Sequence, residues 1–557
     1  MVKNSFNQNI LEKYIRSIFL LAFFLSGFSA AQAQTNRYIV YFTDKANTPY
    51  SISEPAAFLS QRAIQRRTNQ NIPVTEEDLP VNPTYVQGVA NTGAETYFAS
   101  RWFNALLIQT NPTTVSAVEA LSYVDRVELV APGSRLSNRA IGANIEGGSS
   151  LPFFVEDDLS FEQNELLGVN DMHEDGFLGQ GMLIAVLDGG FSGVNQAEAF
   201  KHVYDDGRML GVWNYVRNNN AVYESSSHGT KVLSTIGAFI TDNFVGTAHQ
   251  ASFILLVTED VTEEYRIEEY NWLFGAEYCD SAGVDVINSS VGYYDFDDPN
   301  MNYSFADMDG QTAVVTQAAE IAANKGMLVV VSAGNEGNNN WEKITAPADA
   351  PSVLAIGAIT TTNTVPGFSS LGPAADGRIK PDIMAVGQNT RVIRPSGSIS
   401  SDNGTSYASP QIAGLAAGIW QRTPALTSKE LFDMLRNAGD QASSPDTVRG
   451  FGVPNYLRVI GEEVTGIEEI EGNSFKLYPN PLNGDSFYLQ RKSLLNSDKL
   501  KVGIYNSQGK LLFKTTKRFK DSNLPLEIDM SSFPAGQYLI QLQGRKVSET
   551  LQLIKNS

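Results

Sequence analysis

Cysteine is nearly absent from this sequence: Cys279 is the only one in 557 residues, so no disulfide can form within the chain. Histidine is scarce as well, with four residues. Beyond the N-terminus, no apolar run approaches the ~18 residues that a membrane-spanning helix needs. Hydrophobic residues make up 42% and charged residues 18%, which is typical of a folded globular protein and argues against disorder. The length predicts about two to four domains.

The N-terminus has the pattern of a signal peptide, which we place at residues 1–33. Three basic residues precede the apolar stretch Ile18–Phe28, and Ala31-Gln32-Ala33 follows as an Ala-x-Ala cleavage site. The alternative is an uncleaved membrane anchor. No cysteine lies near the cleavage site to accept a lipid. An exported chain without disulfides is expected to rely on a large hydrophobic core.

Four short segments together hold the residue types that acyl transfer requires. In chain order they contain an aspartate, a histidine, an asparagine and a serine. These supply a carboxylate to orient a base, the base itself, an oxyanion donor and a nucleophile. The set predicts an enzyme that cuts peptide bonds. The segments are Ile184–Gly190, Ser227–Val232, Ser332–Gly337 and Asn403–Pro410.

Ser406 is the predicted nucleophile. Gly404 lets the backbone approach closely, and the apolar run Ala408–Trp420 predicts a helix that begins at the serine. Such a helix points N–H groups and its positive dipole end at the developing oxyanion. Pro410 suits a first-turn position, where its missing N–H costs nothing. For this segment alone a simple helix cap is the plainer interpretation, and the other three segments favour catalysis.

His228 is the predicted general base, because it alone of the four histidines lies in a His-Gly-Thr context that opens a helical pattern. Asp188 would accept its Nδ1–H and fix the tautomer. The alternative for Asp188 is an Asp-Gly turn at the end of a strand. We expect the remaining histidines to be surface or core residues without a catalytic role: His173, His202 and His249.

Asn335 is the predicted oxyanion donor, acting with the N–H of Ser406. It follows the apolar run Met327–Val331, which predicts a buried strand, and it is flanked by Gly334 and Gly337. Its side-chain amide would reach the tetrahedral oxygen from that turn.

In the order Asp, His, Ser, these segments resemble the subtilisin-like serine proteases, the subtilases, over about residues 165–458. Three further segments resemble the family: Val284–Gly292, Phe368–Pro373 and Lys380–Ile383. The resemblance implies a three-layer α/β catalytic domain with a mainly parallel sheet, which we place at residues 165–460. Its strongest predicted strands are Leu183–Leu187, Phe253–Val257, Val284–Asn288 and Leu328–Ser332.

Two positions depart from the family pattern. Tyr407 stands where methionine is common after the nucleophile, and Gln411 stands where histidine is common downstream. Neither position carries chemistry in the mechanism, so we still expect activity. Tyrosine cannot form a sulfoxide, so tolerance to peroxide is expected.

Substrate recognition is implied by resemblance alone. The walls of the pocket for the P1 residue, on the acyl side of the scissile bond, would be Ser290, Val291, Gly292 and Ser332, Ala333, Gly334. Extended protein or peptide substrates would pair through their main chain. The segment Tyr293–Asp298 would overhang the unprimed side, either favouring basic or aromatic substrate residues or forming a solvated loop. No cofactor is required for the chemistry. Calcium sites are usual in the family, but no loop has a recognisable ligand spacing.

Residues 37–130 read as a small α/β module that resembles subtilase pro-domains, which act as inhibitor and folding aid. Strands are predicted at Arg37–Phe42, Ala105–Ile108 and Val127–Val130, and helices at 54–68 and 113–122. An accessory domain retained in the mature enzyme is the alternative. Residues 131–164 are the predicted linker and processing region, with a Gly/Ser-rich stretch that suits an exposed segment.

Residues 473–557 differ from the rest in charge, with 13 Lys and Arg against 6 Asp and Glu, whereas the chain as a whole has a net charge of −20. Short alternating strands separated by turns predict a β-sandwich. Its segments resemble the C-terminal sorting domains of type IX secretion cargo: Tyr478–Pro481, Ile504–Lys510 and Ala535–Tyr538. The implied partner is an outer-membrane export machine, so the protein would be secreted or cell-surface. An ordinary carbohydrate- or protein-binding module is the alternative, and the charge is too thinly spread to indicate nucleic-acid binding.

The sequence therefore predicts a secreted serine endopeptidase made as a zymogen. One rival is a catalytically silent binding protein on the same scaffold, against which the four intact site residues argue. The other is a hydrolase of esters or non-protein amides, against which the groove-forming Ser290–Gly292 segment argues.

Overall fold

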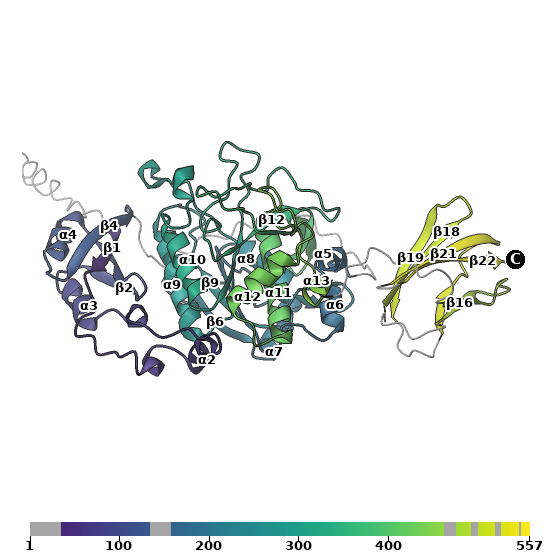
Figure 1. The fold of residues 1–557 in the computed structure, drawn as a ribbon, viewed down its shortest axis with the longest axis horizontal. Coiled ribbons are helices and arrows are strands. Elements are labelled where there is room, and N and C mark those ends of the chain that lie inside the picture. Colours follow the sequence, from purple (N-terminus) through teal and green to yellow (C-terminus); the bar gives the residue numbers. More distant parts are fainter. Residues whose placement is uncertain are drawn as a thin grey trace, which may run out of the picture.

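The computed structural model describes residues 35–133, 158–461, 475–491, 499–518, 525–544 and 547–556. The predicted signal peptide lies outside the described residues, as does most of the predicted linker. We refer to residues 35–133 as the N-terminal module, to 158–461 as the central domain and to the described residues from 475 onward as the C-terminal module (Figure 1).

The central domain is built on a seven-stranded sheet in the order β13-β12-β11-β10-β5-β9-β6. All six neighbouring pairs are parallel. The four strands predicted from the apolar runs are all present, and three further strands extend the sheet at both edges. The strands are β5 (Leu183–Asp188), β6 (Met209–Asn214), β9 (Ser252–Val257), β10 (Val286–Ser289), β11 (Leu328–Ser332), β12 (Leu354–Ile359) and β13 (Ile383–Val386).

Both faces of this sheet are covered by helices, which explains why its strands are continuously apolar. Along β5, Ile184 and Val186 face a core that includes α8 (His228–Gly237) and α11 (Thr405–Arg422). The alternate residues Ala185 and Leu187 face a second core with α9 (Ile267–Ala282) and α10 (Val314–Asn324). The predicted three-layer α/β architecture is therefore confirmed.

Shorter elements complete the central domain. The helices are α5 (Phe161–Leu166), α6 (Val169–Glu174), α7 (Lys201–Asp205), α12 (Ser428–Asn437) and α13 (Tyr456–Val459), with the 3-10 turns η3 (Glu198–Phe200), η4 (Pro299–Met301) and η5 (Phe305–Asp307). The strands are β7 (Phe239–Ile240), β8 (Phe244–Val245), β14 (Thr390–Ile393) and β15 (Ile399–Asp402).

The N-terminal module is a four-stranded antiparallel sheet in the order β2-β3-β1-β4 with helices on one face. The predicted strands and the helix α4 are present, whereas β2 and α3 were not predicted. The elements are β1 (Asn36–Phe42), β2 (Glu95–Ser100), β3 (Ala105–Thr110), β4 (Val124–Ala131), α2 (Gln61–Asn69), α3 (Pro83–Ala90) and α4 (Pro112–Glu119), with η1 (Pro55–Ala57) and η2 (Glu76–Asp78).

The open face of this sheet packs on the central domain. Along β1, Tyr38 and Val40 join the module's own core, whereas Ile39 and Tyr41 join the core beneath α9 and α10. The Tyr41 and Tyr270 hydroxyls are 2.7 Å apart across this interface. Figure 1 shows the module beside α9 and α10. A shared apolar core makes this an extensive interface.

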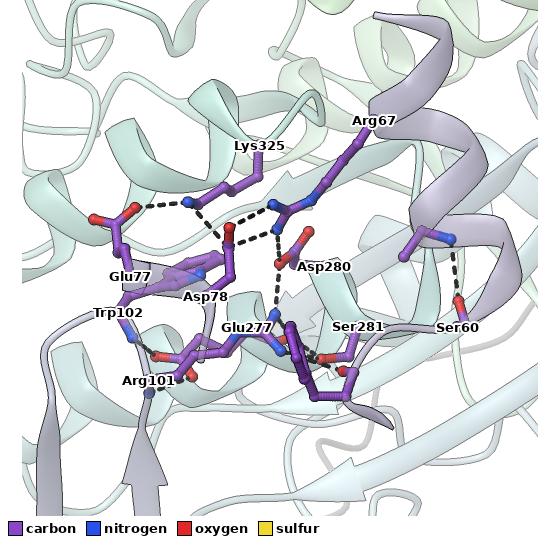
Figure 2. A network of polar contacts seen from close by, with 12 residues as sticks. Ser60, Arg67, Glu77, Asp78, Arg101, Trp102, Glu277, Asp280, Ser281 and Lys325 are labelled. Carbon is purple, nitrogen blue, oxygen red and sulfur yellow. Dashed lines mark hydrogen bonds and ion pairs between the residues drawn. The ribbon is translucent and has the colours of Figure 1, made fainter. Parts of the chain in front are cut away.

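A buried ionic network reinforces the same contact (Figure 2). Asp280 of α9 has a fully buried side chain and forms ion pairs with Arg66, Arg67 and Arg101 of the N-terminal module, the second at 2.6 Å. Arg67 also binds Asp78 through two hydrogen bonds of 2.9 Å. Burial alone would raise the pKa of Asp78, but the hydrogen bonds and charge of Arg67 hold it well below its usual range.

Two further groups extend the network in Figure 2. Glu277 accepts the N–H groups of Arg101 and Trp102 at 2.9 and 3.2 Å. Lys325 of the central domain lies 3.0 Å from Asp78. Burial raises the pKa of Glu277 although these donors oppose the shift. The modules are thus joined by buried charges that each depend on a partner across the interface.

The C-terminal module consists of two antiparallel sheets that share one core. Phe487 and Leu489 from one sheet pack with Val502 and Ile540 from the other. This arrangement is the predicted β-sandwich. The sheet order is β16-β17-β20 and β19-β18-β21-β22. The strands are β16 (Phe475–Tyr478), β17 (Ser486–Arg491), β18 (Lys499–Asn506), β19 (Leu511–Arg518), β20 (Leu526–Asp529), β21 (Gly536–Gly544) and β22 (Val547–Lys555).

Candidate active site

The four predicted catalytic residues all lie where elements of the central domain begin or end. Asp188 is the last residue of β5, and His228 is the first residue of α8. Ser406 is in the first turn of α11, and Asn335 lies in the loop after β11. Ligands bind at the carboxyl ends of strands in parallel α/β sheets, so both strand-derived residues are at the expected edge.

Asp188 and His228 form a close pair. The His228 Nδ1 atom lies 3.0 and 2.9 Å from the two carboxylate oxygens of Asp188. Asp188 is fully buried, and the His228 side chain is 34% exposed, so one side of the ring is open to a substrate. Burial lowers the pKa of His228, but the Asp188 carboxylate raises it by more than burial lowers it. The pKa of His228 therefore lies above the ordinary histidine value. This pair has the geometry of an oriented general base.

The backbone conformation just before Ser406 places this residue at the start of a helix. Gly404 has φ 150°, a conformation that L side chains rarely adopt, and this places the chain at the start of α11. The Ser406 amide is in the first helical turn, which lacks acceptors within the helix. Its hydroxyl donates to the Ser290 carbonyl at 3.3 Å. Within residues 158–461, no hydrogen bond joins this hydroxyl to His228.

The placement of Pro410 in the first helical turn was wrong. The helix α11 begins at Thr405, which puts Pro410 inside it. A proline there leaves the carbonyl four residues earlier without its helical donor, and that carbonyl belongs to Ser406. The Ser290 hydroxyl replaces the missing donor, at 3.0 Å from the Ser406 oxygen. This bond joins the predicted P1-wall segment to the backbone of the predicted nucleophile.

Asn335 is oriented by Thr405, the residue before the predicted nucleophile. Its Oδ1 accepts the Thr405 N–H at 2.9 Å and the Thr405 hydroxyl at 3.1 Å. With the carbonyl oxygen engaged, the NH₂ group is the part of this exposed side chain that can donate to a substrate. Gly334 has φ 111°, and a Cβ there would lie 2.7 Å from the Ser370 hydroxyl, so the turn requires glycine.

The two predicted P1-wall segments adjoin each other. Ser290–Gly292 follows β10, and Ser332–Gly334 ends β11 and begins the next loop. A Cβ on Gly292 would lie 2.3 Å from Thr345 Oγ1, and one on Gly334 would lie 3.1 Å from the same atom. Both segments therefore contact Thr345. Thr345 was not predicted from the sequence, because no local sequence pattern identifies a side chain that contacts two loops distant in the chain.

The other histidines form a separate group. The rings of His173 and His202 lie 5.2 and 6.5 Å from the ring of His249. Burial lowers the pKa of His249 to about 3, and the charges of its neighbours add to this shift. These contacts are consistent with structural roles, and the absence of a catalytic role for these histidines stays a prediction.

Among the described residues, no group of three His, Cys, Asp or Glu side chains is arranged to hold a metal ion. In the same parts of the chain, no helix is both long enough and apolar enough to cross a membrane.

Comparisons with known proteins find relatives of the central domain. Residues 179–453 match the subtilase family model. Subtilisin of Bacillus pumilus is 30% identical over 276 residues, which cover 49% of this chain and 89% of that protein. The chain belongs to the subtilase family. Subtilisin E of Bacillus subtilis is 29% identical over 317 residues, covering 55% of this chain and 74% of that protein. The crystal structure of MycP1 from the ESX-1 type VII secretion system has 22% identity and a TM-score of 0.43, covering 55% of this chain and 86% of that one.

The flanking modules of this subtilase also match family models. Residues 37–143 match the Peptidase S8 propeptide domain of Bacteroidota, and residues 476–556 match a secretion system C-terminal sorting domain. The chain is therefore a serine-type endopeptidase with a propeptide, and its sorting domain directs it through the periplasm and outer membrane by type IX secretion. Its substrates are proteins, and its sorting domain implies contact with the export machinery.

Both departures of this subtilase from the family pattern are accommodated. The Tyr407 ring lies 5.6 Å from the His228 ring, and its hydroxyl donates to Asp402 at 3.2 Å. Gln411 donates to the carbonyls of Tyr407 and Val386, both at 2.6 Å. Each side chain has a structural partner, and neither blocks the Asp188–His228 pair.

Proposed function

We propose that this subtilase hydrolyses peptide bonds through an acyl-enzyme on Ser406, with His228 as general base and Asp188 as the residue that orients it. The observation that carries the proposal is the contact of His228 Nδ1 with both oxygens of the buried Asp188, because it leaves Nε2 as the ring nitrogen that can accept a proton.

Stabilisation of the oxyanion would come from Asn335 and the Ser406 N–H. The Thr405 contacts fix the amide of Asn335 relative to the start of α11, so the two donors belong to one rigid unit. Removing a donor of this kind costs about 10²–10³ in turnover in subtilisin, the system in which this magnitude was established. Residues Ser290–Gly292 and Ser332–Gly334 would line the P1 pocket of an extended substrate.

The module boundaries are part of the proposal. The pro-domain spans residues 37–130, a linker with the processing sites spans 131–164, the catalytic domain spans 165–460 and the sorting domain spans 473–557. The shared core and the ionic network between the N-terminal module and α9 support a pro-domain that folds together with the catalytic domain.

The test compares casein with a small ester as substrates for the processed wild type and two variants. Ser406→Ala is expected to abolish both activities, and Asn335→Ala is expected to leave weak activity, lower by about 10²–10³. Hydrolysis of the ester without casein would contradict an endopeptidase. Equal losses in the two variants would contradict the assigned roles.

A further inference from the structure

Two loops beside the candidate active site are unusually rich in carboxylates. Residues 258–265 follow β9 and hold four, and residues 293–298 follow β10 and hold three, with no Lys or Arg in either segment. The loops are joined directly: the Asp297 N–H donates to the Glu264 carbonyl at 2.9 Å, and the Glu264 N–H donates to the Asp297 carboxylate at 3.0 Å. They therefore form one continuous acidic rim.

Glu259 is the rim residue that lies beside the Asp188–His228 pair. In the register of β5 and β9, Asp188 lies opposite Val257, two residues before Glu259. The Glu259 Oε2 atom lies 3.5 Å from the place that a Cβ on Gly189 would occupy. In sheet order, the P1 walls follow β10 and β11 on one side of β5, and Glu259 follows β9 on the other.

Buried polar atoms beneath the rim lack partners within residues 158–461. Glu268 is 1% exposed, and its Oε1 accepts the Asp260 N–H at 2.9 Å, but its Oε2 has no hydrogen bond. The hydroxyl of the fully buried Tyr293 also has none. Burial raises the pKa of Tyr293, and the Glu259 and Glu268 carboxyls raise it further, so the hydroxyl interacts electrostatically with both groups.

The negative charge of the rim is weakly compensated. Burial raises the pKa of Glu264 to about 7, and the nearby Asp297 carboxylate adds to the shift. The nearest cation in sequence, Arg266, donates to the Met301 carbonyl at 2.8 Å and stacks 4.3 Å from the Tyr303 ring centroid. Its guanidinium also lies 5.9 Å from the Phe296 ring centroid, so within residues 158–461 its contacts are with a carbonyl and two aromatic rings rather than with the rim carboxylates.

A basic side chain of the N-terminal module interacts electrostatically with carboxylates of the first loop and with Glu268. Arg37 on β1 is 4% exposed. Burial lowers its pKa, and the carboxylates of Asp260, Glu263 and Glu268 oppose that shift. In the unprocessed chain a guanidinium thus interacts with Glu268, the carboxyl that lies behind the rim.

We propose that Glu259 and Glu264, backed by the buried Glu268, form a subsite for an arginine or lysine side chain at the substrate residue that precedes P1. The proposal rests on the proposed function, since it needs a peptide in the cleft. Side chains of an extended peptide alternate in direction. If the P1 side chain enters the pocket between Ser290–Gly292 and Ser332–Gly334, the preceding one points toward the loop after β9.

The test uses the processed wild-type enzyme and two internally quenched peptides that differ only in arginine or its neutral isostere citrulline before P1. The expected kcat/KM is about tenfold or more higher for the arginine peptide, as for a partly desolvated charge pair, and the ratio should fall at high salt. The double substitution Glu259→Gln with Glu264→Gln should bring the ratio close to one. Asp205→Asn is the matched control, because it removes one exposed carboxylate of the central domain from α7, outside both loops, and it should leave the ratio unchanged.

A wild-type ratio near one would overturn the proposal, and so would a ratio that survives the double substitution. A ratio near one together with thermal stabilisation by Ca²⁺ that the double variant loses would identify the rim as a cation site instead. Cleavage of the citrulline peptide reports the proposed function separately: if wild type cleaves it and Ser406→Ala does not, the protease assignment holds whatever the ratio.

Discussion

Asp280 provides the sharpest test of how the N-terminal module is held. Its fully buried carboxylate is the shared counter-charge of Arg66, Arg67 and Arg101, whose side chains are at most 8% exposed. In Asp280→Asn these guanidiniums stay buried with one negative charge fewer. Breaking a buried ion pair from one side costs about 3–5 kcal/mol. Because Asp78 still pairs with Arg67, we expect the lower end, about 3 kcal/mol, which is on the order of a 10²-fold shift in the docking equilibrium.

Hydrogen exchange of the full chain, carried in a Ser406→Ala background to prevent self-cleavage, measures that shift. The amides of α2 and of the N-terminal sheet should exchange on the order of 10² times faster in Asp280→Asn, because exchange reports local opening. Asp205→Asn is the matched control: its ion pair with Lys201 is more than half exposed, and such pairs contribute little. Unchanged exchange in α2, or an equal effect in the control, would refute the reasoning.

Three other predictions follow from the site. In Asp188→Asn the charge that raises the pKa of His228 is lost, so the acid limb of kcat/KM should move to lower pH than in the wild type, while turnover falls about 10⁴-fold; an unmoved limb in the pH profile would contradict the pairing. Ser290→Ala leaves the buried Ser406 carbonyl without a donor and should destabilise the protein by about 1–3 kcal/mol in thermal unfolding, and an unchanged midpoint would count against that role. Activity should survive dilute peroxide, since Tyr407 cannot form a sulfoxide; rapid inactivation would show that another residue is sensitive.

Much of the fold could be predicted because the central strands are buried on both faces. Continuous apolar runs such as Leu183–Leu187 signal a covered parallel strand without further context. The edge strand β6 was not predicted, because its sequence lacks such a run and most of its residues are only partly buried. In the N-terminal module, α3 was missed where a proline and a glycine interrupt the helical pattern.

The site was predictable wherever function depends on local sequence. Glycine-flanked turns and a helix start mark Asn335 and Ser406 in the sequence itself. The misplacement of Pro410 has a different origin: the donor that makes an internal proline tolerable is the Ser290 hydroxyl, 116 residues away. The ionic network on Asp280 was likewise invisible, because its arginines and its aspartate are about 180–214 residues apart and only the packed modules bring them together.

Labelling of Ser406 tests the central claim most directly. The intact mass of the secreted protein would be measured by mass spectrometry before and after reaction with a serine-directed fluorophosphonate, with Ser406→Ala as the control. We predict a single adduct on the processed wild type and none on the variant, because only an oriented base activates one serine in this way. The unmodified mass also shows whether the N- and C-terminal modules have been removed. The absence of an adduct on a chain trimmed to its catalytic domain would contradict the account and indicate a catalytically silent scaffold.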